Sequence, residues 1–431
     1  MAESETVTAA AETGTLPERP AWPEWNERER QAVVARFDPR ALPQSFYDNP
    51  YPTYAALRDS DPVHRCPDGS WFLTRHSDLV AVYRDAVRFS SDKKIEFGQK
   101  YGDSALFEHH TTSLVFNDPP LHTRVRRLIV GALTPRAIAG TEPGLVALVD
   151  RLLDAMADKG ECDLIEDFAS AIPVEIIGNL LGVPHADRGP LRAWSLAILG
   201  ALEPVLTAEQ EALGNRSVEE MLVYLKGLVA DRRARPRDPD IDVLTRLIVG
   251  EKDGEKLTET ELLQNCVFIL NAGHETTTNL IGNGLFALME WPGQRARLIA
   301  EPDLIEPAIE EFLRFESSNQ LGNRITTTDV TIGGIKMPAE TRITLCIGAA
   351  NRDPAQFPDP ERLDISRKPN RHLAFGGGAH TCAGLSLARL EGRIAISRLL
   401  ARFPDYALRG EPVRGGRVRF RGFLKVPVRV K

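Results

Sequence analysis

One segment constrains the fold more than any other, the long apolar run between Thr258 and Trp291. Thr258 and Glu261 form a capping-box pattern that begins a helix, and Trp291-Pro292 is the first clear stop signal. The helix between them can have roughly 30 residues, a length of about 45 Å at 1.5 Å per residue. A helix this long and apolar must cross a whole domain, and it therefore predicts a large, mainly helical protein.

The amino-acid composition excludes several classes of protein. The 431 residues are 42% hydrophobic, which is enough to build a large core and excludes wholesale disorder. Lys and Arg number 53 against 60 Asp and Glu, and the two signs are interleaved, which argues against a dedicated nucleic-acid-binding protein. The five cysteines are scattered without CxxC spacing. They fit neither a disulfide framework nor a Cys-rich zinc site, and they favour a reducing compartment.

Targeting signals are missing from the sequence. The first twenty residues lack the basic start and apolar run of a secretory signal. The most apolar internal segment, 266–270, lies between Asn265 and Asn271 and is far too short to span a membrane. We therefore expect a soluble cytoplasmic protein that does not associate with membranes.

Local patterns predict one helical domain with a minor β-rich region. We expect residues 1–36 to form a flexible extension and residues 37–431 to form a single domain. Periodicity and turn signals predict helices at 52–59, through most of 119–235, at 307–315 and at 383–401, and a polar loop at 250–256. Strands are predicted at 63–74 around Asp68-Gly69, at 324–335, at 342–347, and as a hairpin at 417–430 around Arg421-Gly422.

The segment from Phe375 to Gly384 carries the strongest chemical signal. Three consecutive glycines precede Cys382, and a helix-forming run follows it. The thiol is thus expected near a helix N-terminus, where the helix dipole and free N–H groups favour a thiolate. Glycines lack a Cβ, so a flat, bulky group could lie against this backbone. A phosphate-binding loop does not fit, because the Gly-Lys-Ser/Thr ending is missing. On spacing alone, a tight loop with a buried cysteine is an equal alternative.

The centre of the long helix is unusual. Gly273 and the three threonines at 276–278 are poor mid-helix residues and predict a local opening of the hydrogen-bond ladder. Glu275 places an acid beside the hydroxyl of Thr276 in an apolar setting, and such a pair suits proton delivery to a bound ligand. The simpler alternative is an ordinary helix distortion with Glu275 in a salt bridge.

Two further clusters combine charges at helical spacing. Glu311 and Arg314 lie at i, i+3, and Arg362 could join them as a third member. Such a triad would fix the fold locally if buried and contribute little if exposed. His122 and Arg126 lie at i, i+4 on one helix face. They present two donors to an anion, or they simply begin a basic helix.

Taken in this order and at these distances, the four features resemble the cytochrome P450 family of haem-thiolate monooxygenases, over residues 37–431. The long helix matches the family's oxygen-activation motif, and the Glu311, Arg314 and Arg362 set matches its structural charge triad. The cysteine loop matches its haem-binding signature at Phe375, Gly376, Gly378, His380, Cys382 and Gly384. The resemblance implies the cytochrome P450 fold.

The resemblance also implies a cofactor and its ligands. The cofactor would be haem b (iron protoporphyrin IX), with Cys382 as the axial thiolate that favours O–O cleavage. His122, Arg126, Arg324 and His380 match positions that bind the haem propionates, and Arg324 is placed by the pattern Arg-x4-Asp ending at Asp329. The cofactor-binding set is completed by Ala272, Gly273, Phe375, Gly376 and Gly384.

The acid–alcohol pair indicates the reaction. Thr276 matches the alcohol that hydrogen-bonds to bound dioxygen, and Glu275 matches the acid that relays protons, a position where many relatives carry Asp. The pair implies O2-dependent hydroxylation or heteroatom dealkylation. The alternatives are a peroxide-using or non-oxygenating haem-thiolate enzyme, and a haem-binding sensor or carrier that would need neither Glu275 nor Thr276.

Partners follow from the same resemblance. We expect no reductase domain after Lys431 and no membrane anchor before Phe37. Electrons would then come from a separate ferredoxin or flavodoxin with its NAD(P)H reductase. An acidic partner could dock where Arg124, Arg127 and Arg389 gather.

Family position also suggests a substrate pocket, built from residues 95–114, the helix centre near Phe268 and Ala272, residues 318–323 and the turn at Gly422-Phe423. Its apolar character predicts a hydrophobic organic substrate. Asn319, Gln320 and Asn323 are more polar than the rest, and we favour their solvating a loop over their binding a polar group of the substrate. The candidate pocket residues are Phe97, Leu106, Phe107, Phe268, Gln320 and Phe423.

Overall fold

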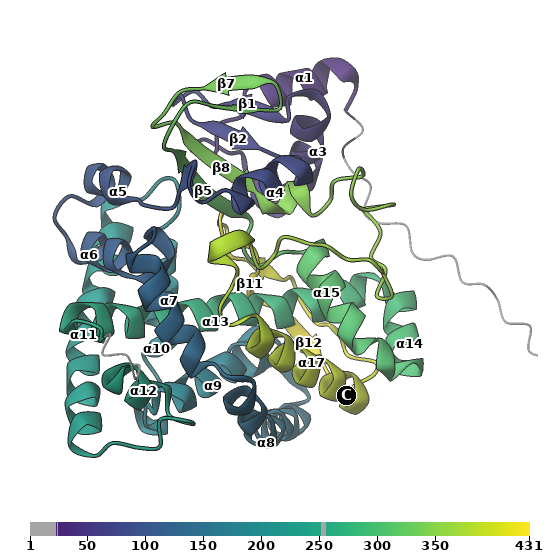
Figure 1. Cartoon of the computed structure of the whole chain (residues 1–431). Helices are drawn as coiled ribbons and strands as arrows, with labels where there is room; N and C mark the ends of the chain where they lie inside the picture. The colour runs from purple at the N-terminus through teal and green to yellow at the C-terminus, as the bar shows by residue number, and fades with distance from the viewer. Residues whose placement is uncertain (1–22, 24, 251–255) are drawn as a thin grey trace, which may run out of the picture.

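The long helix predicted from the sequence is present. In the computed structural model, which describes residues 23, 25–250 and 256–431, α13 (Glu259–Glu290) runs through the middle of the molecule (Figure 1). Its predicted capping box forms, with the Thr258 side chain accepting from the backbone N–H of Glu261. The helix is buried over most of its length, and many of the other helices pack around it.

The predicted opening of the ladder in α13 is wrong. The helix is continuous from Glu259 to Glu290. The hydroxyl of Thr276 donates to the carbonyl oxygen of Ala272 at 2.8 Å, and that of Thr278 donates to the carbonyl oxygen of His274 at 3.0 Å. These back-bonds let threonine remain within an α-helix without competing for its N–H groups.

Helices make up most of the described chain, so the prediction of a mainly helical fold is confirmed. α9, α15 and α17 pack on α13 and share with it the largest hydrophobic core. The remaining helices are α1 (Glu27–Ala35), α2 (Gln44–Asp48), α3 (Tyr51–Ser60), α4 (His76–Arg84), α5 (Lys94–Tyr101), α6 (Ala105–Thr112), α7 (Leu121–Ala132), α8 (Pro135–Lys159), α9 (Ala171–Leu181), α10 (Leu191–Gly200), α11 (Ala208–Ala234), α12 (Val243–Val249), α14 (Pro292–Ala300), α15 (Ile305–Phe315), α16 (Ile347–Ala350) and α17 (Leu385–Arg402).

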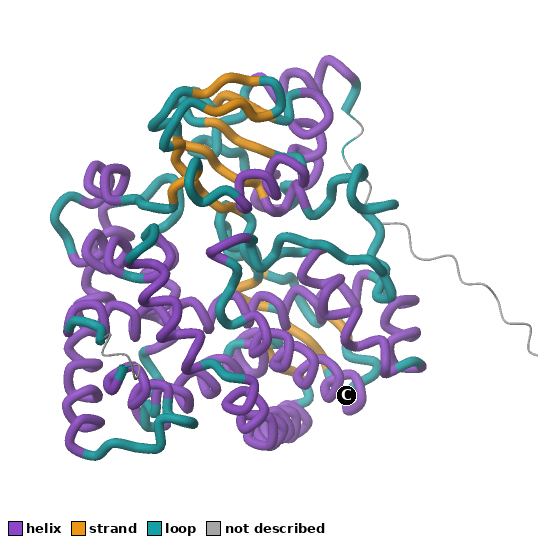
Figure 2. Tube along the Cα trace, viewed as in Figure 1, coloured by secondary structure: helices purple, strands orange, loops and turns teal. Residues whose placement is uncertain are grey.

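The largest β-sheet has five strands and lies at one end of the molecule (Figure 2). Its order is β1-β2-β8-β5-β3, and the hairpin predicted around Asp68-Gly69 forms its β1-β2 edge, with Gly69 at φ +81° in the turn. The strands are β1 (Val63–Arg65), β2 (Trp71–Leu73), β3 (Phe89–Ser90), β4 (Glu161–Asp163), β5 (Leu321–Thr326), β6 (Val330–Ile332), β7 (Ile335–Met337), β8 (Arg342–Cys346), β9 (Ala407–Leu408), β10 (Val413–Arg414), β11 (Phe423–Lys425) and β12 (Pro427–Arg429).

The hairpin predicted around Arg421-Gly422 is wrong. β11 pairs with β10, whereas β12 pairs with β9 and with β4, some 260 residues earlier in the chain. The two strands therefore belong to different small sheets. Alternation along a sequence indicates that a segment is extended, but it does not reveal a partner strand so far away.

The domain begins earlier than the predicted boundary at residue 37. α1 starts at a capping box of Asn26 and Glu29 and packs on α3, where Val34 is buried and Trp25 joins the same apolar cluster. The prediction of a flexible extension therefore fails for the α1 segment. For residues 1–22 and 24 it lies outside the described residues, as does most of the polar loop predicted at 250–256.

No helix in the described ranges combines the length and apolarity needed to cross a bilayer.

Candidate active site

A cavity of about 360 Å³ lies against the middle of α13. Its wall comes from α6, α7, α9 and α10, from the glycine-rich loop that leads into α17, and from β5 and the segment after β10. All ten predicted cofactor-binding residues line it, together with Thr276. The ten are His122, Arg126, Ala272, Gly273, Arg324, Phe375, Gly376, His380, Cys382 and Gly384.

Cys382 sits directly before the N-terminus of α17, as its neighbours predict. Its backbone N–H donates to the carbonyl oxygen of Phe375 at 2.9 Å, which closes the loop, and Gly384 is the N-cap of the helix. Burial raises the pKa of the Cys382 thiol, while the backbone N–H of Gly384 and the charges of Arg126 and Arg389 act in the opposite direction. The loop thus supplies a buried sulfur with thiolate-stabilising groups around it.

Two glycines are required by the geometry of this loop. Gly376 and Gly378 have φ values of +65° and +64°, in the left-handed region that disfavours side chains. A Cβ on Gly378 would also overlap the carbonyl oxygen of Tyr83 at the end of α4. The glycines therefore let the loop turn tightly against α4 and face its backbone to the cavity.

Four cationic or imidazole side chains reach the cavity with unused donors. Both ring nitrogens of His122 and Nε2 of His380 are buried without a partner, and the two rings lie 3.9 Å apart between centroids. Within the described chain, Arg324 donates only to the carbonyl oxygen of Asn323, at 2.7 Å, and Arg126 forms no ion pair. Such a cluster of orphaned donors is suited to carboxylates that arrive with a ligand. The residues present fit a haem with two propionates.

Burial sets the charge state of these imidazoles. It lowers the pKa of His380 to about 3, with the charges of Arg324, His122 and Arg126 adding to the effect. It also lowers the pKa of His122, and Arg126 contributes. Both rings are therefore neutral donors at neutral pH when no anion is present.

Glu275 and Thr276 occupy different faces of α13. Thr276 lines the cavity, whereas Glu275 lines a small second pocket behind it. Oε1 of Glu275 accepts from Nη1 of Arg417 at 2.6 Å, and Oε2 is buried without a partner. Burial raises the pKa of Glu275, and Arg417 opposes the rise. The structure thus adopts the salt bridge of the simpler alternative and places only the hydroxyl on the cavity wall.

Most of the predicted substrate contacts are wrong, because in the described chain only Phe268 of the six lines the cavity. Phe97 packs in an aromatic cluster with Tyr101 and Phe116, at centroid distances of 5.3 and 5.1 Å. Leu106 is completely buried against α11, and Phe107 packs beside Gly98. These side chains therefore pack α5 and α6 against each other, and α6 against α11.

Gln320, just before β5, and Phe423, the first residue of β11, also do not line the cavity. Gln320 faces away from the cavity, since its Nε2 donates to the carbonyl oxygen of Ser317 at 2.7 Å. Phe423 packs on Phe286 with centroids 4.5 Å apart and borders the second pocket, and Phe420 lines the cavity instead. Successive side chains of an extended segment point to opposite faces, so an error of one or three residues reverses which side chain points inward.

Other residues that line the cavity lie in the predicted segments 95–114 and 318–323 or outside any predicted segment. Asn319 and Asn323 line the cavity and are not exposed, so the preferred interpretation that they solvate a loop is wrong. Helices α9 and α10 also contribute, and nothing local in their sequence marks them as cavity walls. The additional lining residues include Leu114, Val115, Phe116, Ile177, Leu199, Leu202, His110, Asn271 and Arg419.

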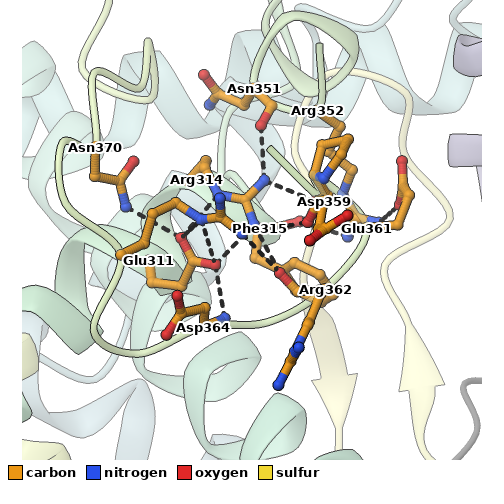
Figure 3. Close-up of polar contacts among 12 residues, drawn as sticks. Glu311, Arg314, Phe315, Asn351, Arg352, Asp359, Glu361, Arg362, Asp364 and Asn370 are labelled. Carbon is orange, nitrogen blue, oxygen red and sulfur yellow. Dashed lines mark hydrogen bonds and ion pairs between the residues drawn. The ribbon is translucent and has the colours of Figure 1, made fainter. Parts of the chain in front are cut away.

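The charge cluster on α15 forms, but with a different third member. Glu311 and Arg314 have fully buried side chains, and Nη2 of Arg314 lies 2.7 Å from Oε1 of Glu311 (Figure 3). Arg367 completes the set, with Nε 3.2 Å from Oε2 of Glu311. Arg362 contributes only its carbonyl oxygen to Arg314, and the residue is exposed. The predicted role of the Arg362 side chain is therefore wrong, because the chain turns that side chain toward solvent.

The predicted docking arginines are largely engaged within the chain. Arg124 pairs with Glu261 at the start of α13, and Arg389 pairs with Glu310 at 2.6 Å. These ion pairs reduce the positive charge that either residue can offer to an acidic partner.

Comparisons with known proteins agree with this geometry. A family model described as Cytochrome P450 matches residues 198–405. The chain is 40% identical to the vitamin D(3) 25-hydroxylase of Pseudonocardia autotrophica, over 84% of this chain and 89% of that protein. It resembles the solved structure of P450BioI in complex with a hexadec-9Z-enoic acid ligated acyl carrier protein, with a TM-score of 0.85 and 35% identity over 90% of this chain and 100% of that one. It also resembles myxobacterial cytochrome P450 CYP267B1 in complex with myristic acid, with a TM-score of 0.83 and 35% identity over 91% and 100% of the two chains.

Proposed function

The chain belongs to the cytochrome P450 family, and from that premise we propose how its residues carry out the reaction. It is a haem monooxygenase that uses O2 on small-molecule substrates. We assign the cofactor as haem b with Cys382 as its thiolate ligand, and the reaction as hydroxylation or heteroatom dealkylation of a largely apolar molecule. The observation that supports this most is that Cys382, the orphaned donors and Thr276 all face one cavity.

The residues of the cavity divide between holding the cofactor and excluding water. His122, Arg126, Arg324 and His380 would bind the propionates, which would satisfy donors that are otherwise unpaired. When bound, the haem supplies dioxygen activation, assisted by electron density from the thiolate. The apolar wall around Phe268 and Leu199 would exclude water and orient the substrate.

Glu275 and Thr276 would transfer protons from solvent to the cavity. The Thr276 hydroxyl donates to the carbonyl oxygen of Ala272, and the residue lies on the cavity wall. Glu275 reaches solvent through Arg417, whose side chain is 17% exposed. We propose that Glu275 takes up protons through this contact and that Thr276 presents them inside the cavity. This pair favours an O2-dependent reaction over a peroxide-using enzyme, a rearranging enzyme or a passive haem carrier.

Replacing Thr276 with alanine tests this function. We expect the product formed per NAD(P)H consumed to fall about tenfold, with peroxide formed in its place, because no hydroxyl then delivers protons in the cavity. Product, peroxide and NAD(P)H consumption are measured together. Thr278→Ala is the matched control, since Thr278 makes the same back-bond but does not line the cavity. Fully coupled turnover in Thr276→Ala would remove the role assigned to this residue.

We also propose that a separate ferredoxin or flavodoxin, with its NAD(P)H reductase, supplies the electrons, and that the protein works in the cytoplasm. Because Arg124 and Arg389 are engaged in ion pairs, we do not assign the docking surface to them.

A further inference from the structure

Arg419 is a buried cation on the cavity wall without a carboxylate partner. Its Nη1 donates to the carbonyl oxygen of Leu321 at 3.2 Å, and its Nη2 donates to Oδ1 of Asn323. Its Nε is buried and has no partner. Both acceptors are neutral, and among the described residues no carboxylate lies within the 4.0 Å of an ion pair. The charge of Arg419 is therefore not compensated by a direct contact.

Other buried arginines in this protein have carboxylate partners. Arg314 pairs with Glu311, Arg352 with Glu361, Arg421 with Glu316, and Arg232 with Asp242, and none of these arginines lines the cavity. The arginines that do line it are Arg126, Arg324 and Arg419. A buried charge without a counter-ion is costly, which suggests that the counter-ions of these three arrive with bound molecules.

The haem accounts for two of the three cavity arginines. In the proposed function, Arg126 and Arg324 bind propionates. Arg419 has no assigned counter-ion. It lies on the segment between β10 and β11, beside the apolar residue Phe420. A third anion is therefore needed, and the substrate is the remaining molecule that enters this cavity.

The carboxylates that act on Arg419 from nearby are engaged with other groups. Two carboxylates, Glu203 and Glu96, act electrostatically on Arg419. Glu203 accepts hydrogen bonds from the backbone N–H groups of Val418 and Arg419, at 2.8 and 3.1 Å. Glu96 forms an ion pair with Lys93 at 2.6 Å. Lys100 adds a further cation, which binds only carbonyl oxygens. Burial, with the charge of Arg419, lowers the pKa of Lys100 to about 8. The guanidinium of Arg419 thus has only neutral acceptors in direct contact.

We propose that Arg419 binds the carboxylate of an otherwise hydrophobic substrate, so that the natural substrate class is amphiphilic carboxylic acids. This inference rests on the proposed monooxygenase function. The guanidinium has a free Nε–H, and a carboxylate could displace the weaker carbonyl contact at Nη1 to form a charge-assisted pair. The apolar wall of Leu199, Leu202 and Phe268 would receive the hydrocarbon part.

The test compares acids with their neutral analogues on the holoprotein. The probes are straight-chain carboxylic acids of about 10 to 16 carbons and their methyl esters, because an apolar pocket buries hydrocarbon ligands of this size. Dissociation constants are measured by the change in haem absorbance and, independently, by calorimetry. We expect wild-type protein to bind at least one acid roughly ten- to a hundredfold more tightly than its ester, as for a charge-assisted pair. Arg419→Gln should abolish that preference, and Arg419→Lys should keep part of it.

Arg429→Gln is the matched control, because Arg429 lies on the same C-terminal segment but is exposed and away from the cavity. Acids that bind no better than their esters to wild-type protein, or not at all, would overturn the proposal, as would a preference that survives in Arg419→Gln. The wild-type comparison stands even if a variant fails to fold. Each sample is first checked for the thiolate-type carbon monoxide band. Loss of that band in wild-type protein would instead overturn the proposed function.

Discussion

Replacing Glu311 with glutamine is expected to lower the free energy of unfolding by about 3–5 kcal/mol, the usual cost of breaking a buried ion pair. The Glu311 carboxylate is fully buried and pairs with both Arg314 and Arg367. It also accepts from Nδ2 of Asn370 and from the backbone N–H of Asp364. Glutamine would leave two buried guanidinium groups without a charge partner. Chemical denaturation of the purified protein measures the loss.

Arg367, the third member of the Glu311 cluster, and Arg362, the residue predicted for that place, provide the internal control. Arg367→Ala should also destabilise, by about 1–3 kcal/mol, because it removes a hydrogen bond to a buried charged group. Arg362→Ala should stay within about 0.5 kcal/mol of wild type, since the residue is exposed and its contribution comes from the backbone carbonyl. The reverse order of the two effects would show that the Glu311 cluster is assembled differently.

Glu391 is expected to make the protein less stable as the pH rises. This residue of α17 is 3% exposed and lines the cavity, and its Oε2 has no hydrogen-bond partner. Burial raises the pKa of Glu391 to about 8. A carboxyl whose folded pKa is raised binds its proton more tightly in the folded state, so its contribution is intact below about pH 4.5 and is lost as the pH rises to about 8. A rise of this size corresponds to a stability loss on the order of 4–5 kcal/mol.

Glu391→Gln should remove this pH dependence, because the amide is neutral at every pH. Unfolding free energies of wild type and variant are measured between pH 5 and 9, and the variant should be the more stable by a margin that grows with pH. Glu306→Gln, on the exposed part of α15, is the control and should leave the slope unchanged. Parallel stability curves for wild type and Glu391→Gln would show that Glu391 is ionised in the folded protein at neutral pH.

Structural features that depend on residues close together in the chain could be predicted from the sequence. The capping box at Thr258, the stop at Trp291-Pro292 and the tight loop before Cys382 each depend on residues close in the chain. The glycines of the loop reflect a positive φ that few other residues adopt. The long helix, the cysteine at a helix N-terminus and the helical fold class followed from these local signals.

Features that depend on distant contacts could not be predicted. Arg362 and Arg367 lie in the same loop, and only the folded backbone decides which guanidinium reaches Glu311. The partner of β12 is β4, far away in sequence. The place of Arg419 on the cavity wall could not be predicted for the same reason, since its partners in β5 and at Glu203 come from other parts of the chain. Side-chain direction at a cavity is set by such packing, and sequence patterns encode it poorly.

The most direct test of the account is the absorbance difference spectrum of the dithionite-reduced protein with and without carbon monoxide. The wild-type protein should show a band at the long-wavelength position of thiolate-ligated haem, and Cys382→Ala should lack it. A band at the shorter position typical of a histidine ligand would contradict the assignment of Cys382. A protein that binds no haem would contradict the whole account of the cavity.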